Sequence, residues 1–166
     1  PMELPTEFFL DYAWNPEAWP AERIPEYTRQ WAAHQFGPEH AAEIAALLEG
    51  YTRFNSRRKP ELLEPATFSL NNYGEWERVL SDYNQLAERA RRLNELLPPA
   101  QRDAFYQLVL HPVTACANLY ELYYTVALNR VYASQGRAAT NAMAERAEKL
   151  FARDAEISAY YNHELA

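Results

Sequence analysis

The sequence has little glycine and few runs of β-branched residues, and both shortages count against a β-sheet. Only 4 of its 166 residues are glycine, whereas sheets need tight turns and strands rich in valine, isoleucine and threonine. The same scarcity argues against a glycine-rich phosphate-binding loop. Alanine, leucine, glutamate and arginine are abundant instead, and 48% of the residues are hydrophobic. The composition therefore predicts a folded all-α protein.

Cysteine and positive charge are scarce as well. Cys116 is the only cysteine, so no internal disulfide can form and a buried structural thiol is expected. The formal net charge of −7 argues against a nucleic-acid partner, because phosphate binding needs a basic surface. No signal peptide or hydrophobic anchor is visible, and the chain starts with Pro1 followed by Met2. We therefore expect a piece of a larger protein, for which a missing targeting segment carries no information. No membrane partner is expected, because Pro112, Asn118 and Glu121 interrupt the most apolar segment.

The segment from Ala104 to Tyr132 predicts the helix around which the fold is organised. Its apolar residues occupy almost the whole circumference, which is typical of a helix buried by its neighbours. Pro112 has no backbone N–H to donate, so a kink or break is expected near His111. The few polar residues recur at steps of three and four, which predicts a single polar edge. This polar stripe consists of Gln107, His111, Thr114, Asn118, Glu121 and Thr125.

Four other segments have the apolar spacing of amphipathic helices. Gly37 closes the first, and Asn72 is expected to cap the third together with Glu75. Residues 1–20 predict a short N-terminal helical segment, with one helix from Thr6 to Ala13, and residues 21–166 predict an up-down bundle of about five helices. The four segments run from Ile24 to Phe36, Pro38 to Asn55, Asn72 to Leu97, and about Ala138 to His163.

No histidine in the sequence has the spacing of a metal site. His111 lies on the polar stripe and is expected to hydrogen-bond Gln107 or a neighbouring helix. We therefore predict no metal ligand, no cofactor and no catalytic or substrate-binding residue in this chain. The four histidines are His34, His40, His111 and His163.

Two groups of carboxylates were considered as sites. Glu3, Glu7 and Asp11 fall at steps of four on the N-terminal segment and are expected to be solvated. Glu121 is alone on the buried helix, and an unpaired buried charge is costly. We therefore expect Glu121 to pair with an arginine such as Arg130 or Arg146.

Four segments together resemble one enzyme family, glycoside hydrolase family 115, and the resemblance covers essentially the whole chain. They are PMELPTEFFLDYAWNP at the N-terminus, RRKPELLEPATFSLNNYGEWERV and DAFYQLVLHPVTACANLYELY in the middle, and DAEISAYYNHELA at the end. The most distinctive part is the loop around Pro60 and Pro65.

The resemblance implies an enzyme that removes glucuronic acid or its 4-O-methyl ether from xylan. In that family a helical bundle follows a (β/α)₈ catalytic barrel, and residues from Pro1 to about Trp19 resemble the last turn and last helix of that barrel. The barrel strands that carry the catalytic carboxylates have no counterpart here, so no catalytic residue is carried over. Glu3 would follow the last barrel strand, at the rim where active sites gather, and whether it borders the sugar pocket stays open.

The function that follows is a non-catalytic bundle domain of a periplasmic or secreted α-glucuronidase. Its partners would be the barrel of the same chain, glucuronoxylan through the full-length enzyme, and a second copy of the chain. The alternative is a stand-alone helical interaction or dimerisation module that docks through its polar stripe. A third hypothesis is a sugar-binding module that uses Trp14, Trp19 or Trp31, although the positions of these residues indicate packing.

Overall fold

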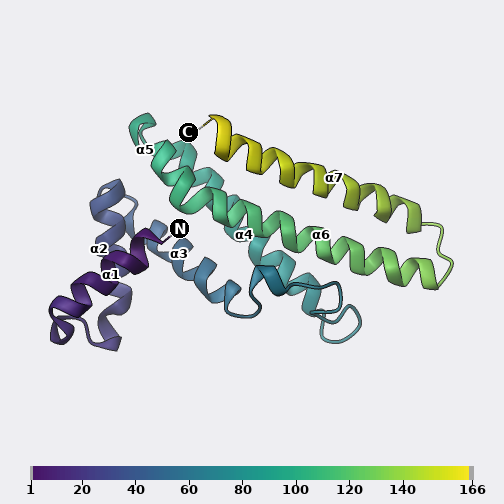
Figure 1. Ribbon diagram of the computed structural model, residues 1–166, viewed down its shortest axis with the longest axis horizontal. Coiled ribbons are helices and arrows are strands. Elements are labelled where there is room, and N and C mark those ends of the chain that lie inside the picture. The colour runs from purple at the N-terminus through teal and green to yellow at the C-terminus, as the bar shows by residue number, and fades with distance from the viewer. Residues whose placement is uncertain (1, 165–166) are drawn as a thin grey trace.

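The computed structural model describes residues 2–164, and these residues form helices and connecting loops with no β-strand (Figure 1). The predicted all-α class is therefore confirmed for this part of the chain. Pro1, Leu165 and Ala166, which were assigned to the two ends of the fold, lie outside the described residues. The domain boundary at residue 20 stays a prediction.

The α-helices agree with the amphipathic segments of the sequence, and three of them continue into or out of π-helical turns. The α-helices are α1 (Glu3–Trp14), α2 (Ile24–Phe36), α3 (Ala41–Asn55), α4 (Glu75–Leu96), α5 (Pro99–Phe105), α6 (His111–Ser134) and α7 (Thr140–Ala159). The π-helical turns are η4 (Tyr106–Leu110) and η5 (Tyr160–Glu164), and the 3₁₀ turns are η1 (Pro16–Ala18), η2 (Ala21–Arg23) and η3 (Pro60–Leu62).

Helix α6 contacts both α7 and α4, and the helices before α4 in the sequence pack one on the next. Helix α3 packs on α4, α2 packs on α3, and α1 contacts α2. Figure 1 shows α6 and α7 side by side along one edge, with α1 and α2 together at the opposite end of the molecule. The helix nearest the N-terminus therefore has neighbours on one side only.

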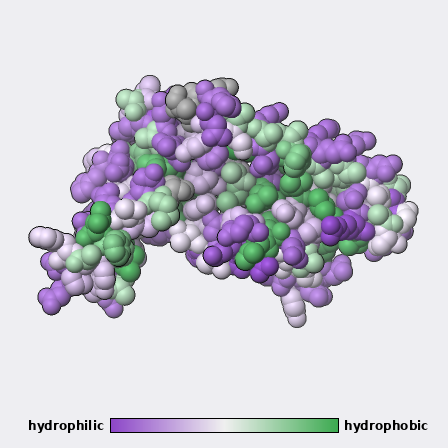
Figure 2. Space-filling model, viewed as in Figure 1, coloured by the Kyte–Doolittle hydropathy of each residue, from purple (hydrophilic) through white to green (hydrophobic). Residues whose placement is uncertain are grey.

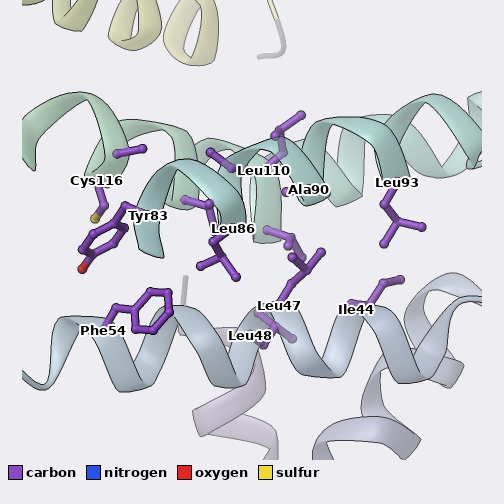
Figure 3. Packing of buried hydrophobic residues seen from close by; sticks show 14 of the residues in the cluster. Ile44, Leu47, Leu48, Phe54, Tyr83, Leu86, Ala90, Leu93, Leu110 and Cys116 are labelled. Atoms are coloured by element: carbon purple, nitrogen blue, oxygen red, sulfur yellow. The ribbon is translucent and has the colours of Figure 1, made fainter. Parts of the chain in front are cut away.

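The core joins α3, α4 and α6 (Figure 3), and aromatic residues form its centre. Trp76, Tyr83 and Tyr120 are fully buried, and the ring centroids of the two tyrosines lie 4.3 Å apart. Their polar ends are satisfied. The Tyr83 hydroxyl donates to Asn55 Oδ1 over 2.9 Å and the Tyr120 hydroxyl donates to the carbonyl of Arg58 over 3.0 Å. Burial raises the pKa of Tyr83 above its ordinary value. These bonds hold the end of α3 against the core.

Helix α4 begins later than the sequence predicted. The expected cap at Asn72 is wrong, because the helix starts at Glu75 after Gly74, which has a left-handed φ of 57°. Ser69 Oγ accepts hydrogen bonds from the backbone of Asn72, and the carboxylate of Glu75 accepts one from the backbone N–H of Ser69. Asn72 therefore belongs to a closed loop that ends before the helix.

The irregularity predicted near His111 is confirmed, and it is a π-helical turn rather than a break. The turn Tyr106–Leu110 joins α5 to α6, directly before Pro112. Proline cannot donate to the preceding turn and its ring crowds the carbonyl there, and a wider turn relieves both conflicts. Both predicted boundaries of α2 hold as well, since the helix begins at Ile24 and ends at Phe36, and Gly37 follows it with a φ of 81°.

Candidate functional site

The inner face of α1 is fastened to α2 by two hydrogen bonds from aromatic side chains. Trp31 Nε1 donates to Glu7 Oε2 over 3.0 Å, and the Tyr27 hydroxyl donates to Asp11 Oδ2 over 2.8 Å. The ring of Phe8 lies between them, with its centroid 5.0 Å from that of Tyr27. Burial and then the bond to Asp11 raise the pKa of Tyr27. Both carboxylates therefore act as anchors for the helix.

The prediction that Glu3, Glu7 and Asp11 are solvated agrees with the exposure of Glu3 and Asp11, whereas Glu7 is half-buried. Glu7 and Asp11 each accept a hydrogen bond from a largely buried aromatic residue of α2. Glu3 is exposed and lines two cavities, one under α1 and one beside the π-helical turn η4. The sequence spacing correctly predicted that the three residues share one helix face. It did not predict that Tyr27 and Trp31 donate hydrogen bonds to that face.

Replacing Glu7 with leucine is expected to lower the free energy of unfolding by about 1–3 kcal/mol, because the buried N–H of Trp31 would then have no acceptor. Glu7→Gln keeps an oxygen in the same place and serves as the matched control, with a smaller loss expected. Urea unfolding of the three proteins provides the measurement. Equal losses in the two variants would show that the bond to Trp31 does not hold α1.

The outer face of α1 is apolar and exposed. We define the α1 apolar face as Phe9, Leu10 and Trp14, whose exposed fractions are 66%, 60% and 91%. No residue of α1 is buried, and Figure 2 shows hydrophobic atoms gathered at the end of the molecule where α1 and α2 lie. A set of large apolar side chains on one exposed helix is typical of an interaction surface.

The tryptophans proposed for sugar binding have different environments. Trp31 is buried in the core, and Trp19 packs edge-on against Tyr27 with Arg23 over its ring at 4.9 Å. The expected packing role is therefore confirmed for these two residues. It is wrong for Trp14, which projects almost completely into solvent.

The part of the polar stripe around Asn118 and Glu121 contacts α7 and is not a free docking face. Asn118 is buried and its Nδ2 donates to the carbonyl of Leu150 on α7 over 3.0 Å. Thr125 is fully buried and donates to the carbonyl of Glu121 over 2.8 Å. The predicted polar edge therefore exists, but its occupant is the last helix of the same chain.

The predicted partner of Glu121 is confirmed. Arg146 of α7 donates from Nη2 to Glu121 Oε1 over 2.5 Å. The side chain of Glu121 retains 21% exposure and that of Arg146 retains 45%, so the pair lies at the edge of the helix contact. Its role is to connect α6 to α7.

The surface has several cavities, with volumes of up to about 450 Å³. One of them lies where the two π-helical turns meet. This π-turn cavity has a volume of about 430 Å³. The rings of His111 and Tyr161 stack beside it with centroids 4.3 Å apart, and Gln107 Nε2 donates to the Tyr161 hydroxyl over 3.4 Å. Its wall consists of Glu3, Tyr51, Pro60, Gln107, Leu108, His111, Pro112, Ala115, Cys116 and Tyr161.

Among residues 2–164, His111 makes no hydrogen bond to Gln107 or to a neighbouring helix, contrary to the sequence prediction. Its Nδ1 atom is buried and has no hydrogen-bond partner among the described residues. Burial lowers the pKa of His111 below its ordinary value, which favours the neutral imidazole. Because an unpaired buried N–H is costly, the neutral ring is expected to keep its proton on Nε2.

Other chemistry-bearing groups in residues 2–164 are not gathered into a site. Cys116 is buried with its Sγ 3.8 Å from Asn55 Oδ1, and burial raises the pKa of its thiol. No group of three histidine, cysteine or carboxylate side chains in the described part of the chain is arranged to hold a metal ion. None of its helices is both long and apolar enough to cross a membrane.

Comparison with known proteins finds a family match for the N-terminal part of the chain. Residues 1–62 match the model of glycosyl hydrolase family 115, a range that includes α1, α2 and α3. No curated protein matches the chain. The resemblance of the segments after residue 62 to the same family stays a prediction. The match over residues 1–62 agrees with the family that the sequence resemblance indicated.

Proposed function

We propose that this chain is the non-catalytic helical bundle domain of an α-glucuronidase that removes glucuronic acid or its 4-O-methyl ether from xylan. The observation that carries the proposal is the family match over residues 1–62, which falls on a chain whose described residues are helical. The domain supports a catalytic barrel located elsewhere in the parent enzyme. The parent enzyme is secreted or periplasmic and acts on glucuronoxylan.

The contacts of the carboxylates on α1 support a structural role for this helix. Glycoside hydrolysis generally needs two carboxyl groups that face a scissile bond across a cleft. Glu7 and Asp11 instead accept hydrogen bonds from Trp31 and Tyr27, so their oxygens are engaged in holding α1 to α2. A carboxylate used in this way is a poor candidate for proton transfer to a sugar.

The α1 apolar face is the proposed contact with the catalytic barrel. Phe9, Leu10 and Trp14 are exposed while the opposite side of the same helix is fastened to α2. Burying such side chains against a partner stabilises it by about 1.5–3 kcal/mol for each fully covered apolar residue. The same face would serve the alternative function, a dimerisation module, if a second copy of the chain covered it.

We expect this chain alone to release no glucuronic acid from glucuronoxylan, whereas the parent enzyme does. In the parent enzyme, the double variant Leu10→Ser, Trp14→Ser is expected to lower the melting temperature and the activity, because the barrel contact loses its apolar side chains. Phe151→Ser is the matched control, since Phe151 is 71% exposed on α7, away from the α1 apolar face.

Two results would contradict the proposal. One is release of glucuronic acid by the isolated chain, and the other is an equal loss in the double variant and the control. Light scattering on the isolated chain tests the alternative. A stable dimer that Trp14→Ser dissociates would favour the dimerisation module over the barrel contact.

A further inference from the structure

The π-turn cavity is constructed from parts of the chain that are far apart in sequence. Glu3 comes from α1, Tyr51 from α3, Gln107 from η4, His111 from α6 and Tyr161 from η5. Its volume of about 430 Å³ falls within the roughly 300–1,000 Å³ of small-molecule sites. π-helical turns occur frequently at functional sites, and here two of them contribute to one cavity wall.

The polar groups of this wall include both hydrogen-bond donors and acceptors. The carboxylate of Glu3 accepts, the amide of Gln107 does both, and the hydroxyls of Tyr51 and Tyr161 do both. His111 adds a donor if its neutral ring is protonated on Nε2, as the buried and unpartnered Nδ1 indicates. Such a mixed set suits a ligand whose own groups donate and accept at once, and hydroxyl groups do so.

The remaining wall is apolar, and the charge of the cavity is negative. Pro60, Leu108, Pro112 and Ala115 present carbon atoms, which match the C–H surfaces of a sugar ring. Glu3 is the only side chain with a full charge among the described residues of the wall. No cationic side chain among the described residues lines the wall, so an anionic ligand would meet the Glu3 carboxylate without a cationic side chain to balance it there, which is unfavourable.

We propose that the π-turn cavity binds an uncharged sugar ring, held by hydrogen bonds to Glu3, Gln107 and His111. The stack of His111 on Tyr161 and the bond from Gln107 to the Tyr161 hydroxyl fix these side chains before the ligand arrives. A site that is already ordered loses less entropy on binding. Binding at this cavity requires no catalytic barrel, so it is independent of the contact proposed for α1.

The test is a titration of the 166-residue chain with xylobiose and, separately, with glucuronic acid, followed by NMR. We expect xylobiose to shift the His111 ring resonances and the Gln107 side-chain amide saturably, with a dissociation constant in the millimolar range. Glucuronic acid is expected to bind at least tenfold more weakly. Gln107→Leu should weaken xylobiose binding at least fivefold, whereas Gln135→Leu, the same substitution directly after the C-terminal end of α6, should leave it unchanged.

Three results would overturn the proposal. They are the absence of saturable xylobiose shifts at His111, equal binding of glucuronic acid, and equal effects of the two glutamine variants. Circular dichroism of each variant establishes that it is folded, and both positions are exposed, so neither substitution disturbs the core. Failure of this test leaves the barrel contact of α1 unaffected, because that contact is measured in the parent enzyme through Leu10 and Trp14.

Discussion

Replacing Trp76 with alanine is expected to lower the free energy of unfolding by about 3–5 kcal/mol, the range for a large aromatic residue removed from a packed core. Trp76 has 0% exposure, and its ring meets that of Phe68 edge-on with centroids 5.1 Å apart. Its Nε1 donates to the carbonyl of Pro65 over 3.2 Å. The substitution therefore leaves a cavity and also frees the loop before α4.

Trp14→Ala is the matched control for this prediction. It removes the same side chain from a position with 91% exposure, so the isolated chain should change by no more than about 0.5 kcal/mol. Urea unfolding followed by far-ultraviolet circular dichroism is suitable, because tryptophan fluorescence would lose a reporter in each variant. Equal losses in Trp76→Ala and Trp14→Ala would contradict the burial that the structure assigns to the two residues.

The contrast between these tryptophans shows where the sequence was informative about the fold. Helix positions follow from apolar spacing and from glycine and proline, so α2 ends at Phe36 before Gly37 as predicted. Trp76 lies in the apolar stripe of a long helix and was correctly assigned to the core. Trp14 lies in a short segment whose carboxylates were expected to face solvent, whereas Glu7 and Asp11 meet α2 and the aromatic side is exposed.

The start of α4 was missed because it depends on tertiary contacts of a loop. Asn72 and Glu75 have the residue types and the spacing of a helix cap. The structure uses Glu75 to accept from the backbone of Ser69, and Ser69 Oγ accepts from the backbone of Asn72. Local patterns offer both arrangements, and only the position of the loop against the core decides between them.

The π-turn cavity was only partly predictable. Pro112 indicated an irregular turn near His111, and the polar stripe included Gln107 and His111. Tyr161 and Glu3 lie 50 and 108 residues from His111 in the sequence, by subtraction of their numbers, and no spacing rule brings such distant residues together. The signal that could have linked them was the aromatic run at the end of α7, which needs a surface to pack on.

The second large effect on stability is expected at the polar contact between α6 and α7. Leu150 is the only fully buried residue of α7 in the described part of the chain, so the contact with α6 depends on few buried groups. The bond from Asn118 Nδ2 to the carbonyl of Leu150 is buried, and the exposed fraction of Asn118 is 3%. A change at Asn118 is therefore expected to affect the attachment of the whole helix.

Asn118→Asp is expected to lower the free energy of unfolding at neutral pH by about 3–5 kcal/mol, the usual penalty for an uncompensated buried charge. An aspartate there faces a carbonyl oxygen and is shielded from water, so its pKa in the folded protein rises above the unfolded value of about 3.9. The folded protein then binds the proton more tightly than the unfolded chain. The destabilisation is therefore smallest below the unfolded pKa and grows as the pH rises through the folded pKa.

Asn162→Asp is the matched control, because the Asn162 side chain also donates to a backbone carbonyl, that of Ser158, over 2.8 Å but is exposed. Its charge stays hydrated, so only the small loss of one exposed hydrogen bond is expected, with little dependence on pH. Thermal unfolding of both variants across the acidic and neutral range provides the measurement. If Asn118→Asp behaves like Asn162→Asp at neutral pH, the contact between α6 and α7 admits water at Asn118, and the buried position assigned to that residue is wrong.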